Sequence, residues 1–191
     1  MKVDNTAVKD KKIGNWLAHH RLAKRRCEMI ADVVKFITMY ELYHDGKLIR
    51  ERSELRQLMY PFTCDSAETG KDRVKYSPEY HYHTKAALEL MGEHPKSHLQ
   101  KYLRHEHMIP RSIVEKKLFE NRGCQLGCAG AVSDVLSQYL KVAIITVAED
   151  KLLKAHGLNQ KMPFDWNGVN PFSRYKAAGI ELCDPQVYNK D

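Results

Sequence analysis

The stretch from Val142 to Gly157 constrains the fold more than any other part of this 191-residue chain. Residues 142–145 are apolar and mostly β-branched, which favours a buried strand. Thr146 and Glu149 then have the spacing of a capping box, which starts helices. Gly157 is a residue that commonly follows the last turn of a helix. The sequence therefore predicts a strand that leads directly into a helix, and a helix that stops before Gly157.

A second stretch, residues 104–111, carries the groups that indicate chemistry. His105 and His107 share one face of a strand and Glu106 occupies the other, because side chains alternate along a strand. Pro110 lacks an amide hydrogen and suits the end of an edge strand. A carboxylate is a natural ligand of Mg²⁺ or Mn²⁺, and an imidazole can take a proton from water. The stretch therefore predicts a metal beside a general base, as phosphodiester chemistry requires.

The segment Glu106-His107-Met108-Ile109-Pro110 resembles the first motif of the HNH (ββα-metal) nucleases. In that family two antiparallel strands and one helix hold a single divalent cation, and a histidine activates water against a phosphodiester. The resemblance implies that His107 is the general base, that Glu106 is a metal ligand, and that Asp150 in the predicted helix is a second ligand. The third ligand stays open between Asn121, Glu149 and His156.

The resemblance requires residues 105–109 to pair antiparallel with residues 142–146, although a long insertion separates them. Residues 112–120 and 131–141 both have helical patterns, so this insertion is expected to be helical. Arg104 and Arg111 flank the motif and are expected to contact phosphates. Mg²⁺ or Mn²⁺ is expected over Zn²⁺. Cys124 and Cys128 could form a zinc site with His81 and His83 as the other ligands. Buried or capping thiols explain the two cysteines better.

The amino-terminal third is read as a long basic helix over residues 13–43. Its apolar residues recur every three or four positions, and Met29 and Phe36 widen this face, so the later half is expected to be buried.

The chain has 31 Lys and Arg against 24 Asp and Glu, a net charge of +7. A positive net charge of this kind favours binding to nucleic acid. The basic block includes the predicted DNA contacts Lys24, Arg25 and Arg26. A solubilising terminus and a homodimer through this helix are the alternatives.

The remaining features bound the class of protein. The five cysteines are scattered, which indicates reduced thiols and a cytoplasmic protein. The longest apolar runs are far shorter than the ~20 residues that a membrane helix needs, so no membrane is expected. Residues 162–175 contain aromatics and prolines and are expected to lie as an ordered loop across the core, where Arg174 meets either a phosphate or loop carbonyls. Three regions are predicted: 1–95, basic and helical; 96–160, HNH-like; and 161–191, an aromatic and proline-containing loop region.

The sequence thus predicts an α+β protein that is mainly helical, with a small two-stranded ββα-metal-like centre, a helical insertion and N-terminal helices. The expected function is a metal-dependent endonuclease that hydrolyses DNA, in restriction, phage defence or a mobile element. The alternative is a non-catalytic DNA- or RNA-binding protein that uses the basic N-terminal helix.

Overall fold

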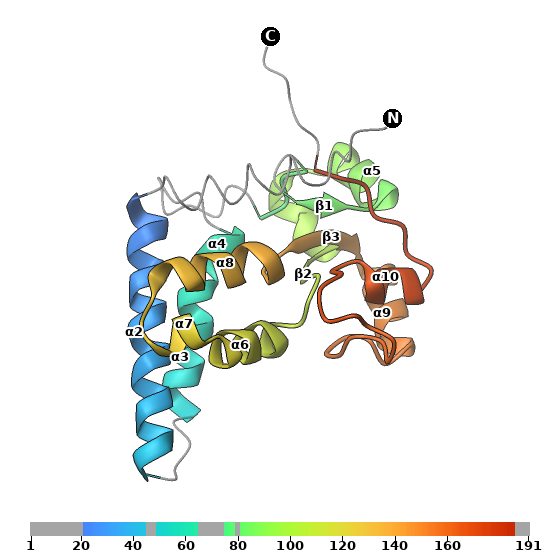
Figure 1. Cartoon of the computed structure of the whole chain (residues 1–191). Helices are drawn as coiled ribbons and strands as arrows, with labels where there is room; N and C mark the ends of the chain where they lie inside the picture. The colour runs from blue at the N-terminus through green and yellow to red at the C-terminus, as the bar shows by residue number, and fades with distance from the viewer. Residues whose placement is uncertain (1–20, 45–48, 65–74, 79–80, 186–191) are drawn as a thin grey trace, which may run out of the picture. The chain divides into compact units, whose positions relative to one another are not determined.

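A computed structural model of the chain describes residues 21–44, 49–64, 75–78 and 81–185 (Figure 1). The chain divides into two compact units. The first consists of Met1–Gly70 with Ile113–Tyr139, and the second of Lys71–Ser112 with Leu140–Asp191. Each unit is thus built from two separate stretches of chain. In the described part of the chain, no helix is long and apolar enough to cross a membrane.

The first unit is helical in its described residues. Its helices are α2 (Arg21–His44), α3 (Ile49–Met59), α4 (Pro61–Cys64), α6 (Arg111–Glu120, which begins in the second unit), α7 (Arg122–Gln125) and α8 (Ala129–Tyr139). α2 contacts α3, α7 and α8. The stripe of α2 that includes Cys27, Ile30 and Val34 is fully buried, as the helical spacing predicts. Met29 and Phe36 are instead 46% and 57% exposed. The expectation that they are buried was wrong, because the helices of this unit cover a narrower face of α2.

The second unit contains the sheet. Its elements are β1 (Tyr82–His83), α5 (Lys85–Glu93), the 3₁₀ helix η1 (Lys96–Lys101), β2 (Leu103–His107), β3 (Val142–Thr146), α9 (Val147–Ala155) and α10 (Ser173–Ala177). The strand order is β1-β3-β2. β1 runs parallel to β3 and β2 runs antiparallel to it. The fold is therefore α+β and mainly helical as expected, but its sheet has three strands where two were predicted.

The predicted pairing across the insertion is confirmed. β2 lies antiparallel to β3, with Leu103 opposite Thr146 and His107 opposite Val142. The strand begins two residues earlier than expected and ends before Ile109. One more backbone bond follows it, from the Met108 N–H to the Lys141 carbonyl at 2.8 Å. α6, α7 and α8 form the insertion between the two strands, which confirms that it is helical.

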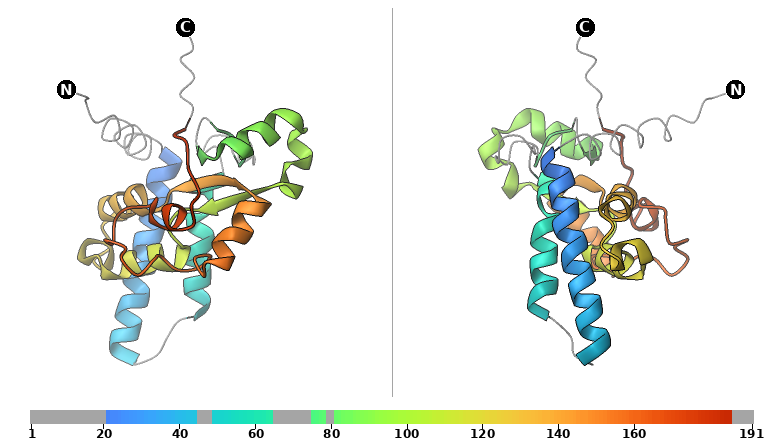
Figure 2. Two further views of the ribbon diagram at one scale, coloured as in Figure 1. Left: turned by 90° about the vertical axis from the view of Figure 1, so that its right-hand side faces the viewer. Right: turned by 60° about the vertical axis from the view of Figure 1, so that its left-hand side comes forward.

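The sheet is covered on both faces, which explains why β3 is apolar throughout. α5 and η1 lie on one side and α9 and α10 on the other (Figure 2). Ile144 and Leu103 pack with Leu99 on the α5 side. Ala143 and Ile145 face the α9 side. The core on that side also contains Met108, Leu153, Leu158, Tyr175, Ala178 and Ile180. The carboxy-terminal segment is thus part of the core of this unit, as the aromatic spacing predicts.

Candidate functional site

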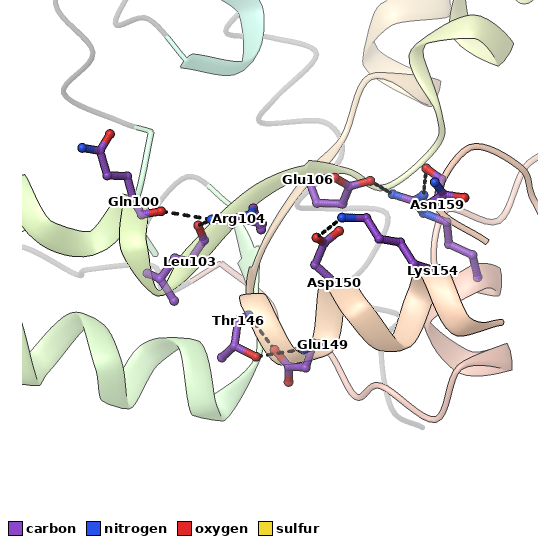
Figure 3. Close-up of polar contacts among 10 residues, drawn as sticks. Gln100, Leu103, Arg104, Glu106, Thr146, Glu149, Asp150, Lys154 and Asn159 are labelled. Atoms are coloured by element: carbon purple, nitrogen blue, oxygen red, sulfur yellow. Dashed lines mark hydrogen bonds and ion pairs between the residues drawn. The ribbon is translucent and has the colours of Figure 1, made fainter. Parts of the chain in front are cut away.

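The candidate site is built on β2, β3 and α9, where the strand-to-helix junction is fixed by a capping box. The Thr146 hydroxyl accepts from the Glu149 N–H at 3.1 Å, and the Thr146 N–H donates to Glu149 Oε2 at 2.7 Å (Figure 3). The Thr84 hydroxyl donates to the same oxygen at 2.9 Å. α9 then ends at Ala155, and Gly157, two residues later, has a φ of +68° that suits glycine. The strand, cap, helix and stop read from the sequence are all confirmed.

Glu106 points to the side of the sheet that α9 covers, where a buried arginine meets it. Arg174 Nη2 donates to Glu106 Oε1 at 2.5 Å and also to the His107 carbonyl. Arg174 Nη1 donates to the carbonyls of Leu158 at 2.9 Å and Asn159 at 3.1 Å. The Arg174 side chain is fully buried. Of the two roles expected for Arg174, the structure shows the contact with loop carbonyls. Arg174 thereby connects the turn after α9 to β2.

Asp150 lies in the first turn of α9, on the same side of the sheet as Glu106. Asp150 Oδ2 accepts from Lys154 Nζ at 2.8 Å, an i,i+4 pair on α9 (Figure 3). Burial raises the pKa of the Glu106 carboxyl, Arg174 opposes this rise, and the Asp150 carboxylate adds to it. The two predicted metal ligands therefore share one electrostatic cluster with two cations.

His107 points to the opposite side of the sheet, as strand alternation predicts. Burial, and after it the positive charge of Arg111, lowers the pKa of its ring to about 3. The buried Nδ1 of His107 has no hydrogen-bond partner among the described residues. The ring is therefore neutral at pH 7, and no described group competes for the lone pair of Nδ1.

Histidines gather on this face of the sheet. The His107 ring lies 6.3 Å from the His105 ring, and the His105 ring lies 5.0 Å from that of His81. His83 faces the same way, because its register partner Ile144 also pairs with His105. The sequence identified His105 and His107 as neighbours. It did not predict His81 and His83 beside them, because β1 is too short to show a strand pattern.

The predicted phosphate contacts fall in both units. Arg104 is exposed, and its Nη1 donates to the carbonyls of Gln100 at 3.0 Å and Leu103 at 2.9 Å (Figure 3). Arg111 is exposed at the start of α6, near enough to lower the pKa of His107. The other three predicted contacts lie on α2 in the first unit, where Lys24 and Arg25 are exposed and Arg26 is half-buried.

The three residues that were left open as the third metal ligand are either helix-capping residues or exposed at a helix end. The Asn121 side chain accepts from the Cys124 N–H and caps α7 in the first unit. Glu149 belongs to the capping box, and His156 is exposed at the end of α9. In the described residues, no group of three or more His, Cys, Asp or Glu side chains is arranged to hold a metal ion.

The two cysteines considered for zinc also differ in their surroundings. Cys124 is buried, and burial raises the pKa of its thiol to about 11, whereas Cys128 is exposed. The account of Cys124 as a buried thiol therefore fits its surroundings.

Two residues of this site were not among the predicted ligands and catalytic groups, and one of them carries a sequence signal. Lys154 follows Asp150 by four residues, the spacing of an ion pair along a helix. The second residue, Arg174, lies 68 positions from its partner Glu106, so no sequence spacing indicates their contact. No protein-family model, curated protein or solved structure matches the chain, so the HNH resemblance stays a prediction.

Proposed function

We propose that the protein is a metal-dependent endonuclease that hydrolyses DNA phosphodiester bonds, with β2, β3 and α9 as its catalytic centre. One observation carries this proposal. Two antiparallel strands lead directly into a helix, and the helix brings Asp150 to the side of the sheet where Glu106 lies. His107 follows Glu106 at the end of β2 and faces the other side of the sheet. The antiparallel strand pair and the helix that follows it support the HNH resemblance.

The donor set fits Mg²⁺ or Mn²⁺ better than Zn²⁺. Glu106 and Asp150 would hold the ion, and both offer oxygen. Mg²⁺ is commonly bound by one or two carboxylates, with water and substrate phosphate as its other ligands. The absence of a third described side-chain ligand is compatible with that mode of binding. When bound, the ion would stabilise negative charge on the phosphate and the leaving oxygen.

His107 is the general base in this proposal. Its ring is neutral at pH 7 because its pKa is about 3, so it can accept a proton from water. The resulting hydroxide attacks phosphorus, and the bond to the leaving oxygen breaks. Such a low pKa makes a weak base; burial is its main cause, and a phosphodiester anion beside Arg111 would offset the second cause, the charge of Arg111. Substrate binding would therefore raise the basicity of His107.

The basic side chains supply contacts with the DNA backbone. Arg111 and Arg104 are exposed at the two ends of the β2 segment, so they would contact phosphates on either side of the scissile bond. Lys24, Arg25 and Arg26 would add contacts from α2. These contacts carry no sequence information, and each neutralised phosphate makes binding more sensitive to salt.

The test is a cleavage assay on plasmid and on single-stranded DNA, with Mg²⁺, with Mn²⁺ and with a chelator. Wild type should cut only with metal, and His107→Ala should reduce the rate ~10²–10⁴-fold, the usual loss when a general base is removed. His105→Ala is the matched control on the same face and should be much milder. Asp150→Asn should raise the metal concentration that half-maximal cleavage requires. Equal cleavage by wild type and His107→Ala would refute the role of His107.

The alternative is a non-catalytic nucleic-acid-binding protein. It is favoured by the pairing of both carboxylates, Glu106 with Arg174 and Asp150 with Lys154. In that case Arg174 serves the fold alone, and α2 provides the binding surface. No cleavage with any divalent metal, together with salt-dependent DNA binding, would support this alternative.

A further inference from the structure

A stacked aromatic pair, an exposed Tyr102 and a half-buried His94, lies in the segment that leads into β2, outside the catalytic centre described above. The rings of His94 and Tyr102 stack with their centroids 4.1 Å apart and an angle of 6° between their planes. His94 follows α5 and Tyr102 follows η1, so the pair encloses the 3₁₀ helix. Tyr102 is 39% exposed. In such a stack each ring covers one face of the other, so only the outer face of each ring can take a further flat ring.

The backbone holds Tyr102 in place. Its N–H donates to the Leu99 carbonyl at 3.0 Å, and its carbonyl accepts from the Val147 N–H at 2.8 Å. Leu99 and Leu103, on either side of Tyr102, are buried in the core of the sheet's α5 face. The backbone at Tyr102 is therefore held in place before any ligand arrives, which lowers the entropic cost of binding.

Positive charge follows His94 along the chain, and one acidic residue, Glu93, directly precedes it. Residues 94–104 contain no Asp or Glu, and they include Lys96, Lys101 and Arg104, all of which are exposed. Arg104 is held by two backbone carbonyls through Nη1, so its guanidinium stays close to η1 (Figure 3). Aromatic rings amid cations match the chemistry of a nucleotide, which has a flat base beside a phosphate.

The same segment continues into the catalytic strand. Tyr102 precedes His107 by five residues, which is about 16 Å along a strand. We propose that the His94–Tyr102 stack binds an unpaired base of single-stranded DNA, while Lys96, Lys101 and Arg104 contact its phosphates. This makes single-stranded DNA the substrate class of the proposed nuclease, since a base inside a duplex presents no free face. Only the cleavage of the bound strand rests on the proposed nuclease function; the binding of the base does not depend on it.

The test measures binding of the full-length protein to labelled DNA in a chelator, so that no metal-dependent cleavage interferes. The probes are a single strand, the same sequence as a duplex, and an abasic strand of equal length. Wild type should prefer the base-containing single strand to both of the others. Tyr102→Leu should weaken that binding about 5- to 140-fold, the effect of losing one stacked base. Tyr102→Phe keeps the ring and should stay within about twofold.

Two further variants complete the design. Phe164→Leu removes an aromatic ring that is fully exposed elsewhere in the same unit, and it should leave binding unchanged. Replacing Lys96 and Lys101 with glutamine should reduce the salt slope by about 0.7 for each lost phosphate contact. Equal affinity of wild type for base-containing and abasic strands would overturn the proposal. So would a Tyr102→Leu variant that binds as tightly as Phe164→Leu.

The binding and cleavage assays separate the two proposals. If the base-dependent binding is found but no divalent metal supports cleavage, the stacking site stands and the nuclease proposal fails. If metal-dependent cleavage is found but Tyr102→Leu binds single-stranded DNA as wild type does, the nuclease stands and the stacking site fails.

Discussion

Replacing His107 with glutamine should remove much of the loss of stability that the protein undergoes between pH 7 and pH 5. Burial lowers the pKa of His107 from 6.5 to about 3 in the folded protein. The unfolded chain therefore takes up a proton as the pH falls below 6.5, while the folded ring stays neutral. The stability that depends on the neutral ring is complete above pH 6.5 and is lost progressively as the pH falls towards 3.

The size of this effect follows from the pKa difference. A pH of 5 is about 1.5 units below the pKa of the imidazole in the unfolded chain, and each unit corresponds to about 1.4 kcal/mol. The free energy of unfolding of wild type should therefore fall by about 2 kcal/mol more than that of His107→Gln between pH 7 and pH 5.

The assay is urea unfolding of both proteins at the two pH values, with His156→Gln as the control. His156 is exposed at the end of α9, so its replacement should leave the pH dependence of wild type unchanged. Titration of the imidazole signals by nuclear magnetic resonance gives the pKa of His107 directly. The reasoning is refuted if the resonance of His107 titrates near pH 6.5, or if His107→Gln loses as much stability as wild type.

Two further predictions concern the polar contacts that hold the site together. Arg174→Met should lower the free energy of unfolding by about 3–5 kcal/mol, because it leaves Glu106 half-buried without its cation. Adding Glu106→Gln should recover part of this loss in a double-mutant cycle, and strictly additive losses would argue against the pair. Thr146→Ala should cost about 1 kcal/mol in urea unfolding through loss of the helix cap, whereas Thr146→Ser should cost little. Equal losses from the two Thr146 variants would show that packing, not capping, sets the role of Thr146.

The parts of the fold that could be predicted carry local signals. β3 and α9 are specified by a β-branched run, a capping box and a glycine within 16 residues, from Val142 to Gly157. The pairing of β2 with β3 is a long-range feature, and it was predicted because strand alternation and the family resemblance pointed to the same two segments. The exact start of β2 was not predicted, because Leu103 reads equally well as a helical or a strand residue.

The parts that could not be predicted depend on tertiary contacts. β1 consists of only Tyr82 and His83 and exists because β3 offers it a second edge. The exposure of Met29 and Phe36 depends on which helices cover α2, and a periodic stripe does not contain that information. Similarly, the cation that meets Glu106 comes from α10, which the sequence places in a loop.

The two cations beside the candidate metal ligands differ in how readily they can be displaced. Arg174 is fully buried and bonds several backbone carbonyls, so it stays in place when a metal binds. The Lys154 side chain is 56% exposed and makes one ion pair with Asp150 at 2.8 Å. Exposed pairs contribute at most about 1 kcal/mol. Lys154 is therefore the cation that a divalent metal would replace at Asp150.

Removing this competitor should strengthen metal binding. Lys154→Gln should lower the Mn²⁺ concentration needed for half-maximal cleavage by up to about fivefold, which corresponds to about 1 kcal/mol. Lys151→Gln is the matched control, since Lys151 is exposed on the same helix. Calorimetric titration with Mn²⁺ should give the same order of affinities without DNA. If Lys154→Gln and Lys151→Gln bind Mn²⁺ equally, Asp150 does not exchange its lysine for a metal, and its role as a ligand fails.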